Sequence, residues 1–309
     1  DISAVTRDPF RPVSIGTKSQ GLFIYDSIRH RWEPRLTFSK PIEALQASTG
    51  MVWLLSQGAV FTIAADRVIQ PLSSKLPEVI SIAAAPHAPA AVLRCRTGHV
   101  YLASDQRQLR TLVGDAAPGW DPTAAPAVGL LNELVVFGGD RPHWYDLTTR
   151  HWQPLAIATV TEIVPALGAL WLRTSTGVVR LTSDRKLESI PQTESVIGLA
   201  GTPEQVVVLN NDGVIRVHTK DNPDWVTLNE APNGPKASLL QDSNWLAACV
   251  GDDLYLSGGK ESEAWLFRWK SQQWQRVTSP AGPLNRVLRF LAGGNRIFAL
   301  DQSGVLHEG

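Results

Sequence analysis

Residues 127–155 read AVGLLNELVVFGGDRPHWYDLTTRHWQPL and contain four short, largely apolar segments separated by turn residues. The segments are Ala127 to Leu131, Leu134 to Gly139, His143 to Asp146 and Trp152 to Leu155. Each segment has about the length of an ordinary β-strand, roughly five residues. Asn, Gly and Asp separate them, and these residues favour reversal of the chain. The stretch therefore predicts a four-stranded antiparallel sheet.

The same four-segment pattern can be followed eight times along the 309 residues. The last copy, 286–309, is incomplete, because its three segments, Val287 to Leu291, Arg296 to Leu300 and Gly304 to His307, are followed by no fourth. Turn glycines return at intervals of about 40 residues or about twice that, which is the spacing of propeller blades. These glycines are Gly21, Gly58, Gly98, Gly177, Gly213 and Gly304.

Helical alternatives fail, because no window keeps apolar residues at helical spacing beyond about two turns. We therefore predict an all-β chain, a β-propeller of four-stranded antiparallel blades. Residues 1–309 are expected to form a single domain, with an incomplete last repeat. Eight blades are expected from the repeats, and seven is the alternative if the terminal segments merge into one blade.

Two copies carry a glycine doublet after the second segment, Gly138-Gly139 and Gly258-Gly259. In the first of them, Tyr145-Asp146 ends the third segment and Trp152 follows six residues after the Asp. This arrangement resembles a kelch repeat. Tyr25-Asp26 with Trp32 repeats the spacing. The outer tryptophans Trp32, Trp152 and Trp274 are interpreted as packing residues that fill the space between blades.

Two other segments, Ser14 to Thr17 and Leu170 to Thr174, resemble instead the blades of bacterial two-component regulator propellers. Such propellers are often sensor regions outside the cytoplasm. The resemblance thus implies a bacterial protein and an extracytoplasmic location, periplasmic or secreted.

The composition excludes several classes of function. The chain has 29 Lys and Arg against 29 Asp and Glu, and 43% of its residues are hydrophobic. A long disordered chain and a strongly basic nucleic-acid binder are therefore not expected. The longest stretch without a charged residue, Val79 to Leu93, contains Pro86 and Pro89 and is too short to span a bilayer. We expect no insertion into a membrane.

No residue pattern indicates a metal, a cofactor or a catalytic site. The two cysteines, Cys95 and Cys249, are interpreted as buried free thiols. The seven histidines are scattered, and no Cys/His spacing is typical of zinc. No nucleotide-binding loop or nucleophile motif is present.

Function in a propeller usually lies where loops from successive blades meet on one face. The turns between second and third segments and the connections between repeats are expected to share that face. One long connection, Gly114 to Pro126, has Trp120 at its centre, and a second runs from Asn229 to Ser243. Trp and Arg often carry the binding energy of an interface. The binding residues expected on this face are Trp120, Asp140, Arg141, Arg173, Asp212, Lys260 and Glu261.

We therefore expect a non-enzymatic binding or scaffold propeller that recognises a protein or a carbohydrate through this face. The alternative is a kelch-like carbohydrate-active enzyme, a sugar epimerase or lyase, with its site at the mouth of the central channel. Arg, Glu and His side chains converging in one deep pocket would favour the enzyme. The oligomeric state and the partner stay open.

Overall fold

The structure is a computed structural model of the chain. All the secondary-structure elements that it describes are β-strands. The chain forms two units, Asp1–Leu155 and Ala156–Gly309. Among the described residues there is no helix long and apolar enough to cross a membrane. The described residues are 2–7, 13–17, 21–26, 31–34, 41–48, 50–64, 69–73, 75–84, 90–104, 106–112, 125, 127–222, 224–228, 246–250, 253–258, 263–268, 271, 273–279, 282–283, 287–293, 296–301 and 306–308.

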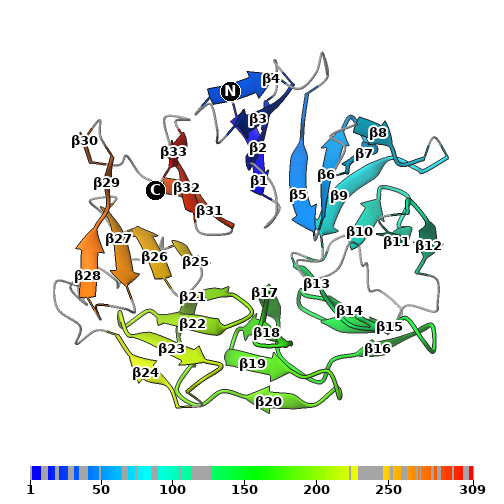
Figure 1. The fold of residues 1–309 in the computed structure, drawn as a ribbon. Coiled ribbons are helices and arrows are strands. Elements are labelled where there is room, and N and C mark those ends of the chain that lie inside the picture. Colours follow the sequence, from blue (N-terminus) through cyan, green and yellow to red (C-terminus); the bar gives the residue numbers. More distant parts are fainter. Residues whose placement is uncertain are drawn as a thin grey trace. The chain divides into compact units, whose positions relative to one another are not determined.

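The described strands of the first unit form four sheets of four strands, and in each sheet the strands pair antiparallel in chain order (Figure 1). We call them sheet 1 (β1–β4), sheet 2 (β5–β8), sheet 3 (β9–β12) and sheet 4 (β13–β16). The strands are β1 (Ile2–Arg7), β2 (Val13–Thr17), β3 (Leu22–Asp26), β4 (Arg31–Pro34), β5 (Ala44–Ser48), β6 (Met51–Ser56), β7 (Ala59–Ile63), β8 (Ile69–Pro71), β9 (Val79–Ala84), β10 (Ala90–Cys95), β11 (Val100–Ser104), β12 (Leu109–Thr111), β13 (Val128–Leu131), β14 (Leu134–Phe137), β15 (His143–Asp146) and β16 (His151–Pro154).

The second unit repeats this plan in sheet 5 (β17–β20), sheet 6 (β21–β24) and sheet 7 (β25–β28), while sheet 8 (β31–β33) has three described strands. The strands are β17 (Val160–Ala166), β18 (Ala169–Thr174), β19 (Gly177–Leu181), β20 (Leu187–Ser189), β21 (Val196–Gly201), β22 (Gln205–Asn210), β23 (Ile215–Thr219), β24 (Val226–Thr227), β25 (Leu246–Val250), β26 (Asp253–Gly258), β27 (Glu263–Arg268), β28 (Gln273–Arg276), β29 (Thr278–Ser279), β30 (Gly282–Pro283), β31 (Val287–Gly293), β32 (Arg296–Asp301) and β33 (Leu306–Glu308).

The predicted all-β architecture of four-stranded antiparallel sheets is confirmed. The described residues contain seven four-stranded sheets and one three-stranded sheet, and the latter corresponds to the incomplete repeat 286–309. A short ribbon, β29–β30, was not predicted from the sequence. Within each unit the first strands of consecutive sheets contact one another, as β5 does with β1 and β9, and β21 with β17 and β25.

Burial in these sheets is greatest in the second strand and least in the fourth. All residues of β6, β14 and β22 are buried, whereas all three residues of β20 are exposed. A strand that is covered on both faces reads as a continuous apolar run. This explains sequences such as Leu134–Phe137, LVVF, which lack the alternation typical of a strand with one exposed face.

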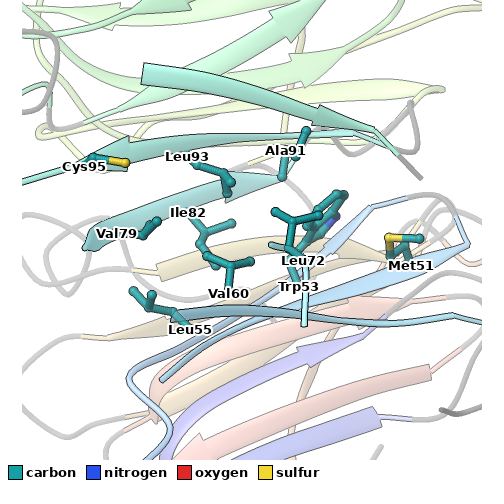
Figure 2. Packing of buried hydrophobic residues seen from close by; sticks show 11 residues of the cluster. Met51, Trp53, Leu55, Val60, Leu72, Val79, Ile82, Ala91, Leu93 and Cys95 are labelled. Atoms are coloured by element: carbon teal, nitrogen blue, oxygen red, sulfur yellow. The ribbon is translucent and has the colours of Figure 1, made fainter. Parts of the chain in front are cut away.

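The cores lie between neighbouring sheets. Figure 2 shows the cluster formed by sheets 2 and 3, in which Trp53 and Leu55 of β6 pack with Ala91 and Leu93 of β10. Trp53 is completely buried, and its indole Nε1 donates a hydrogen bond of 2.9 Å to Ser48 Oγ. Each sheet therefore hides its apolar face only when the next sheet is present.

The tryptophans of the outer strands differ in burial. Trp274 of β28 is buried between sheets 6 and 7, and its Nε1 donates to Leu228 O of the preceding sheet at 3.2 Å. Trp152 of β16 packs on Tyr145 and Phe137 of its own sheet but is only half-buried. Trp152 also packs against the hydrophobic cluster between sheets 3 and 4. The interpretation as packing residues between sheets is therefore confirmed for Trp274 and Trp152, although Trp152 is less completely buried. The side chain of Trp32 lies outside the described residues.

The Asp-to-Trp spacing of the fourth repeat has a local physical basis. Asp146 is buried, and its Oδ1 accepts hydrogen bonds from the backbone N–H groups of Thr148 and Thr149, at 2.8 and 3.1 Å. The carboxylate therefore holds the β15–β16 turn in place. This turn determines the pairing of β15 with β16, in which Trp152 lies directly opposite Tyr145.

Candidate functional site

Turns between second and third strands lie beside the segments that lead into the first strands, as predicted. In the first unit, Arg96 N donates to Glu78 O at 2.9 Å. In the second unit, Ser175 N donates to Thr159 O at 3.0 Å, and Asn211 N donates to Ser195 O at 2.8 Å. We call this surface of each unit its turn surface. Its described segments are 41–43, 57–58, 76–80, 96–99 and 138–142 in the first unit, and 157–162, 173–176, 192–197 and 211–214 in the second.

Glycine in the turn permits this close approach. Gly177 has φ 137°, and a Cβ there would lie 2.9 Å from Thr193 Oγ1 and 3.1 Å from Thr193 O. Gly58 has φ 72°, and a Cβ would lie 2.5 Å from Glu78 Cγ. Both the backbone conformation and the available space thus require glycine at these turns.

The last residue of the second strand connects to the same lead-in segment in several sheets. Ser56 Oγ donates to Pro41 O at 2.8 Å, and Asn210 Nδ2 donates to Gln192 O at 3.4 Å. Cys95 occupies the corresponding position, with its Sγ 3.9 Å from Pro77 O. The predicted free, buried thiol is confirmed for Cys95, and burial raises its pKa. The side chain of Cys249 lies outside the described residues.

The turn surface of the first unit carries a charged pair and an exposed apolar side chain. Arg96 Nε and Nη2 donate to the two carboxylate oxygens of Glu78, both at 2.8 Å, and these hydrogen bonds lower the pKa of Glu78. Ile80 follows Glu78 by two residues, in β9, and is 39% exposed. Only one other large hydrophobic residue in the described part of the chain, Leu187, is exposed to a similar extent, at 37%.

Ile80 is exposed because β9 contains a β-bulge. Arg94 pairs with Ser81 and Cys95 with Val79, so Ile80 is the extra residue between two pairs. A bulge redirects side chains and is common beside binding sites. The same irregularity recurs near the beginning of the first strand in sheets 1, 5, 6 and 8.

In sheet 5 the bulge is followed by an ion pair. Glu162 of β17 lies opposite Arg173 of β18, and Arg173 Nε donates to Glu162 Oε2 at 2.9 Å. The Arg173 side chain is 27% exposed and that of Glu162 is 35% exposed. Burial raises the pKa of the Glu162 carboxyl, although the neighbouring Arg173 guanidinium lowers it. The ionised carboxylate is therefore held against an unfavourable loss of solvation.

The predicted binding residues fall into three groups. Arg173 belongs to the turn surface of the second unit, and Asp212 lies in its β22–β23 turn, where Oδ1 accepts from Val214 N at 2.9 Å. Asp140 and Arg141 are exposed neighbours in the β14–β15 turn of the first unit. Trp120, Lys260 and Glu261 lie outside the described residues, as do both long connections apart from Ala125.

Sequence reasoning missed Glu78, Ile80 and Glu162. All three lie in or just before a first strand, where a residue count alone assigns each side chain to the ordinary alternation. The bulge changes that assignment by one residue, and it is visible only in the strand pairing. Within the described part of the chain, no group of three or more His, Cys, Asp or Glu side chains could hold a metal ion.

The raised pKa of Glu162 has a measurable consequence for stability. The folded chain binds this proton more tightly than the unfolded chain, so the associated stability is lost as the pH rises through the raised pKa. Relative to the original chain, Glu162→Gln should therefore be more stable at neutral pH than at acidic pH. Urea unfolding of both chains across this pH range tests the effect. A relative stability that falls as the pH rises would contradict it.

The sheet order and the packing of consecutive first strands define a β-propeller, and solved structures show the same fold. No model of a known protein family matches the chain, and neither does any curated protein. The Dos1 propeller is similar with a TM-score of 0.66 and 14% identity, over 100% of this chain and 91% of that one. Sqt1 of Saccharomyces cerevisiae gives 0.65 and 12%, over 100% and 95% of the two chains. The C-terminal WD40 domain of Sif2 gives 0.65 and 8%, with the same coverage.

Proposed function

We propose that the chain is a binding or scaffold propeller that recognises a protein partner through its turn surface. The observation that carries this proposal is the exposed Ile80, two residues after Glu78, which forms an ion pair with Arg96. Arginine is one of the residues that most often carry the binding energy of an interface, and burying an exposed apolar side chain against a partner is favourable. Asp140, Arg141 and Asp212 are exposed polar residues on the same kind of turn.

We also propose that the two units belong to one propeller domain. The solved propellers support this, because the likeness extends over 100% of the chain for three of them. Nothing in the described residues favours a carbohydrate partner over a protein, so the carbohydrate becomes an outcome of the experiment.

The two exposed hydrophobic residues provide a matched test of the turn surface. The purified chain is applied to an array of immobilised peptides and glycans, together with the variants Ile80→Asp and Leu187→Asp. Ile80→Asp should weaken peptide binding about tenfold or more, because a charge replaces the apolar contact. Leu187→Asp changes a similarly exposed residue on the outer strand β20 and should leave binding unchanged.

Both substitutions are at exposed positions, so equal melting midpoints are expected and serve as the control for folding. Equal effects of the two variants on peptide binding would contradict a role of the turn surface. Binding to glycans alone, or chemical conversion of a glycan, would contradict a protein-binding function and favour the enzyme.

A further inference from the structure

Arg173 uses one of its five N–H groups in a hydrogen bond to another described residue. Its Nε donates to Glu162 Oε2, and within the described part of the chain Nη1 and Nη2 make no hydrogen bond. Glu162 Oε1 is likewise unbonded. Because both side chains are partly exposed, the pair presents donors and an acceptor to solvent, side by side.

The blade architecture does not require an ion pair at this position. The equivalent pair after the bulge is Gly198 with Leu209 in sheet 6 and Ala4 with Gly16 in sheet 1. Two apolar residues and two glycines form the same bulge in these two sheets without any charge. The formation of this bulge therefore does not depend on the Glu162–Arg173 ion pair.

Sheet 3 shows what an arginine does at this position when its role is structural. Arg94 lies opposite Ser81, just as Arg173 lies opposite Glu162. Its Nε donates to Ser81 Oγ and its Nη1 donates to Ala125 O, so the guanidinium is bound inside the first unit. Among the residues that the structure describes, the end of the Arg173 guanidinium has no such acceptor.

The pair also carries a cost in stability. Burial outweighs the attraction of Arg173 and raises the pKa of Glu162. A partly buried ion pair of this kind is weak support for a fold. It is useful for recognition, however, because a guanidinium that is already oriented loses less freedom when a ligand binds.

We propose that Arg173 and Glu162 bind the side-chain carboxamide of an asparagine or glutamine in the protein partner. The carboxamide oxygen accepts from the open guanidinium end, and the carboxamide N–H donates to Glu162 Oε1. The pair is formally neutral, so an uncharged group that is both donor and acceptor fits it better than a carboxylate, which Glu162 would repel. This inference rests on the proposed protein-binding function.

A library of blocked peptides with a single varied central residue tests the proposal. The centre is Gln, Asn, Glu, Asp, Arg, Lys or Ala, and binding is compared between the original chain, Glu162→Gln and Glu188→Gln. The original chain should enrich Gln and Asn about tenfold over Ala, the effect of a charge-assisted hydrogen bond. Glu162→Gln leaves the site with a net positive charge and should shift the preference toward Glu and Asp.

Glu188→Gln is the matched control, because Glu188 accepts from Arg180 Nη1 at 3.2 Å on the outer strands of the same sheet. It should leave the preference unchanged. As a second measurement, the ¹⁵N resonance of Arg173 Nε, assigned by its loss in Arg173→Lys, should shift when a Gln-centred peptide is added.

Three results would overturn the inference: no preference for Gln or Asn, the same preference in Glu162→Gln, or an equal change in Glu188→Gln. If peptides still bind and Ile80→Asp still weakens that binding, these results contradict only the proposed role of the Arg173–Glu162 pair, and the proposed protein-binding function stands. If no peptide binds at all, both the proposed protein-binding function and the proposed role of the pair are wrong.

Discussion

Replacing Trp171 by alanine should lower the free energy of unfolding by about 3–5 kcal/mol, the usual cost of removing a buried indole. Trp171 of β18 is 1% exposed and packs with Val178 of sheet 5 and Leu199 of sheet 6. Its Nε1 donates to Ala166 O at 3.0 Å. The substitution therefore opens a cavity between two sheets and also leaves a buried carbonyl without this donor.

Trp152→Ala is the control for Trp171→Ala, because it removes the same side chain from a half-buried position. We expect it to cost less than Trp171→Ala, since part of the Trp152 ring stays in contact with solvent in the folded chain. Urea unfolding of the two variants, followed by circular dichroism, measures the difference. If both variants lost the same free energy of unfolding, the placement of Trp171 in a buried position between the sheets would be wrong.

Gly201→Ala should destabilise the chain by about 1–3 kcal/mol or more, because the added methyl group has no room. A Cβ at Gly201 of β21 would lie 2.5 Å from Ala166 Cβ and 3.0 Å from Val164 Cγ1, both in β17. Because Ala166 Cβ is fixed to its backbone, the backbone must move to admit another carbon here. Thermal unfolding measures the loss.

Gly198→Ala is the matched control in the same strand. The nearest atom to a Cβ at Gly198 is Leu209 Cβ at 3.7 Å, an ordinary contact. This variant should therefore unfold at nearly the same midpoint as the original chain. The double variant Ala166→Gly with Gly201→Ala moves the methyl group to the other strand and should recover part of the loss. A harmless Gly201→Ala would mean that β17 and β21 do not approach so closely.

The fold could be predicted because its signals are local. Apolar segments of strand length, turn glycines and the incomplete repeat 286–309 all appear in the sheets where they were expected. The glycines Gly21, Gly58, Gly98, Gly177 and Gly213 all have positive φ. The ends of the strands were predicted less accurately. The first strand of the second repeat was expected at Ile42 to Leu45, whereas β5 is Ala44–Ser48. Strand ends depend on pairing with a neighbour, which a single segment does not contain.

The candidate site could be predicted only in part. The loops that share a surface were recognised, and Arg173, Asp140, Arg141 and Asp212 lie in or next to them; a binding role for these residues stays a prediction. The carboxylate that holds Arg173 was not, because Glu162 and Arg173 meet through the register of β17 against β18. Ile80 was assigned to an ordinary strand, and a bulge turns it outward.

By itself, the sequence determined the secondary structure, the repeat and its period, because strand length, apolar patterning and turn residues act over a few neighbouring positions. Only the tertiary structure decided which residues stand opposite each other, which tryptophan is buried and which polar groups stay open. A single extra residue in one strand shifts the following pairs, and burial depends on the adjacent sheet. Both are contacts between segments distant along the chain, and they place Glu162 beside Arg173 and leave Ile80 exposed.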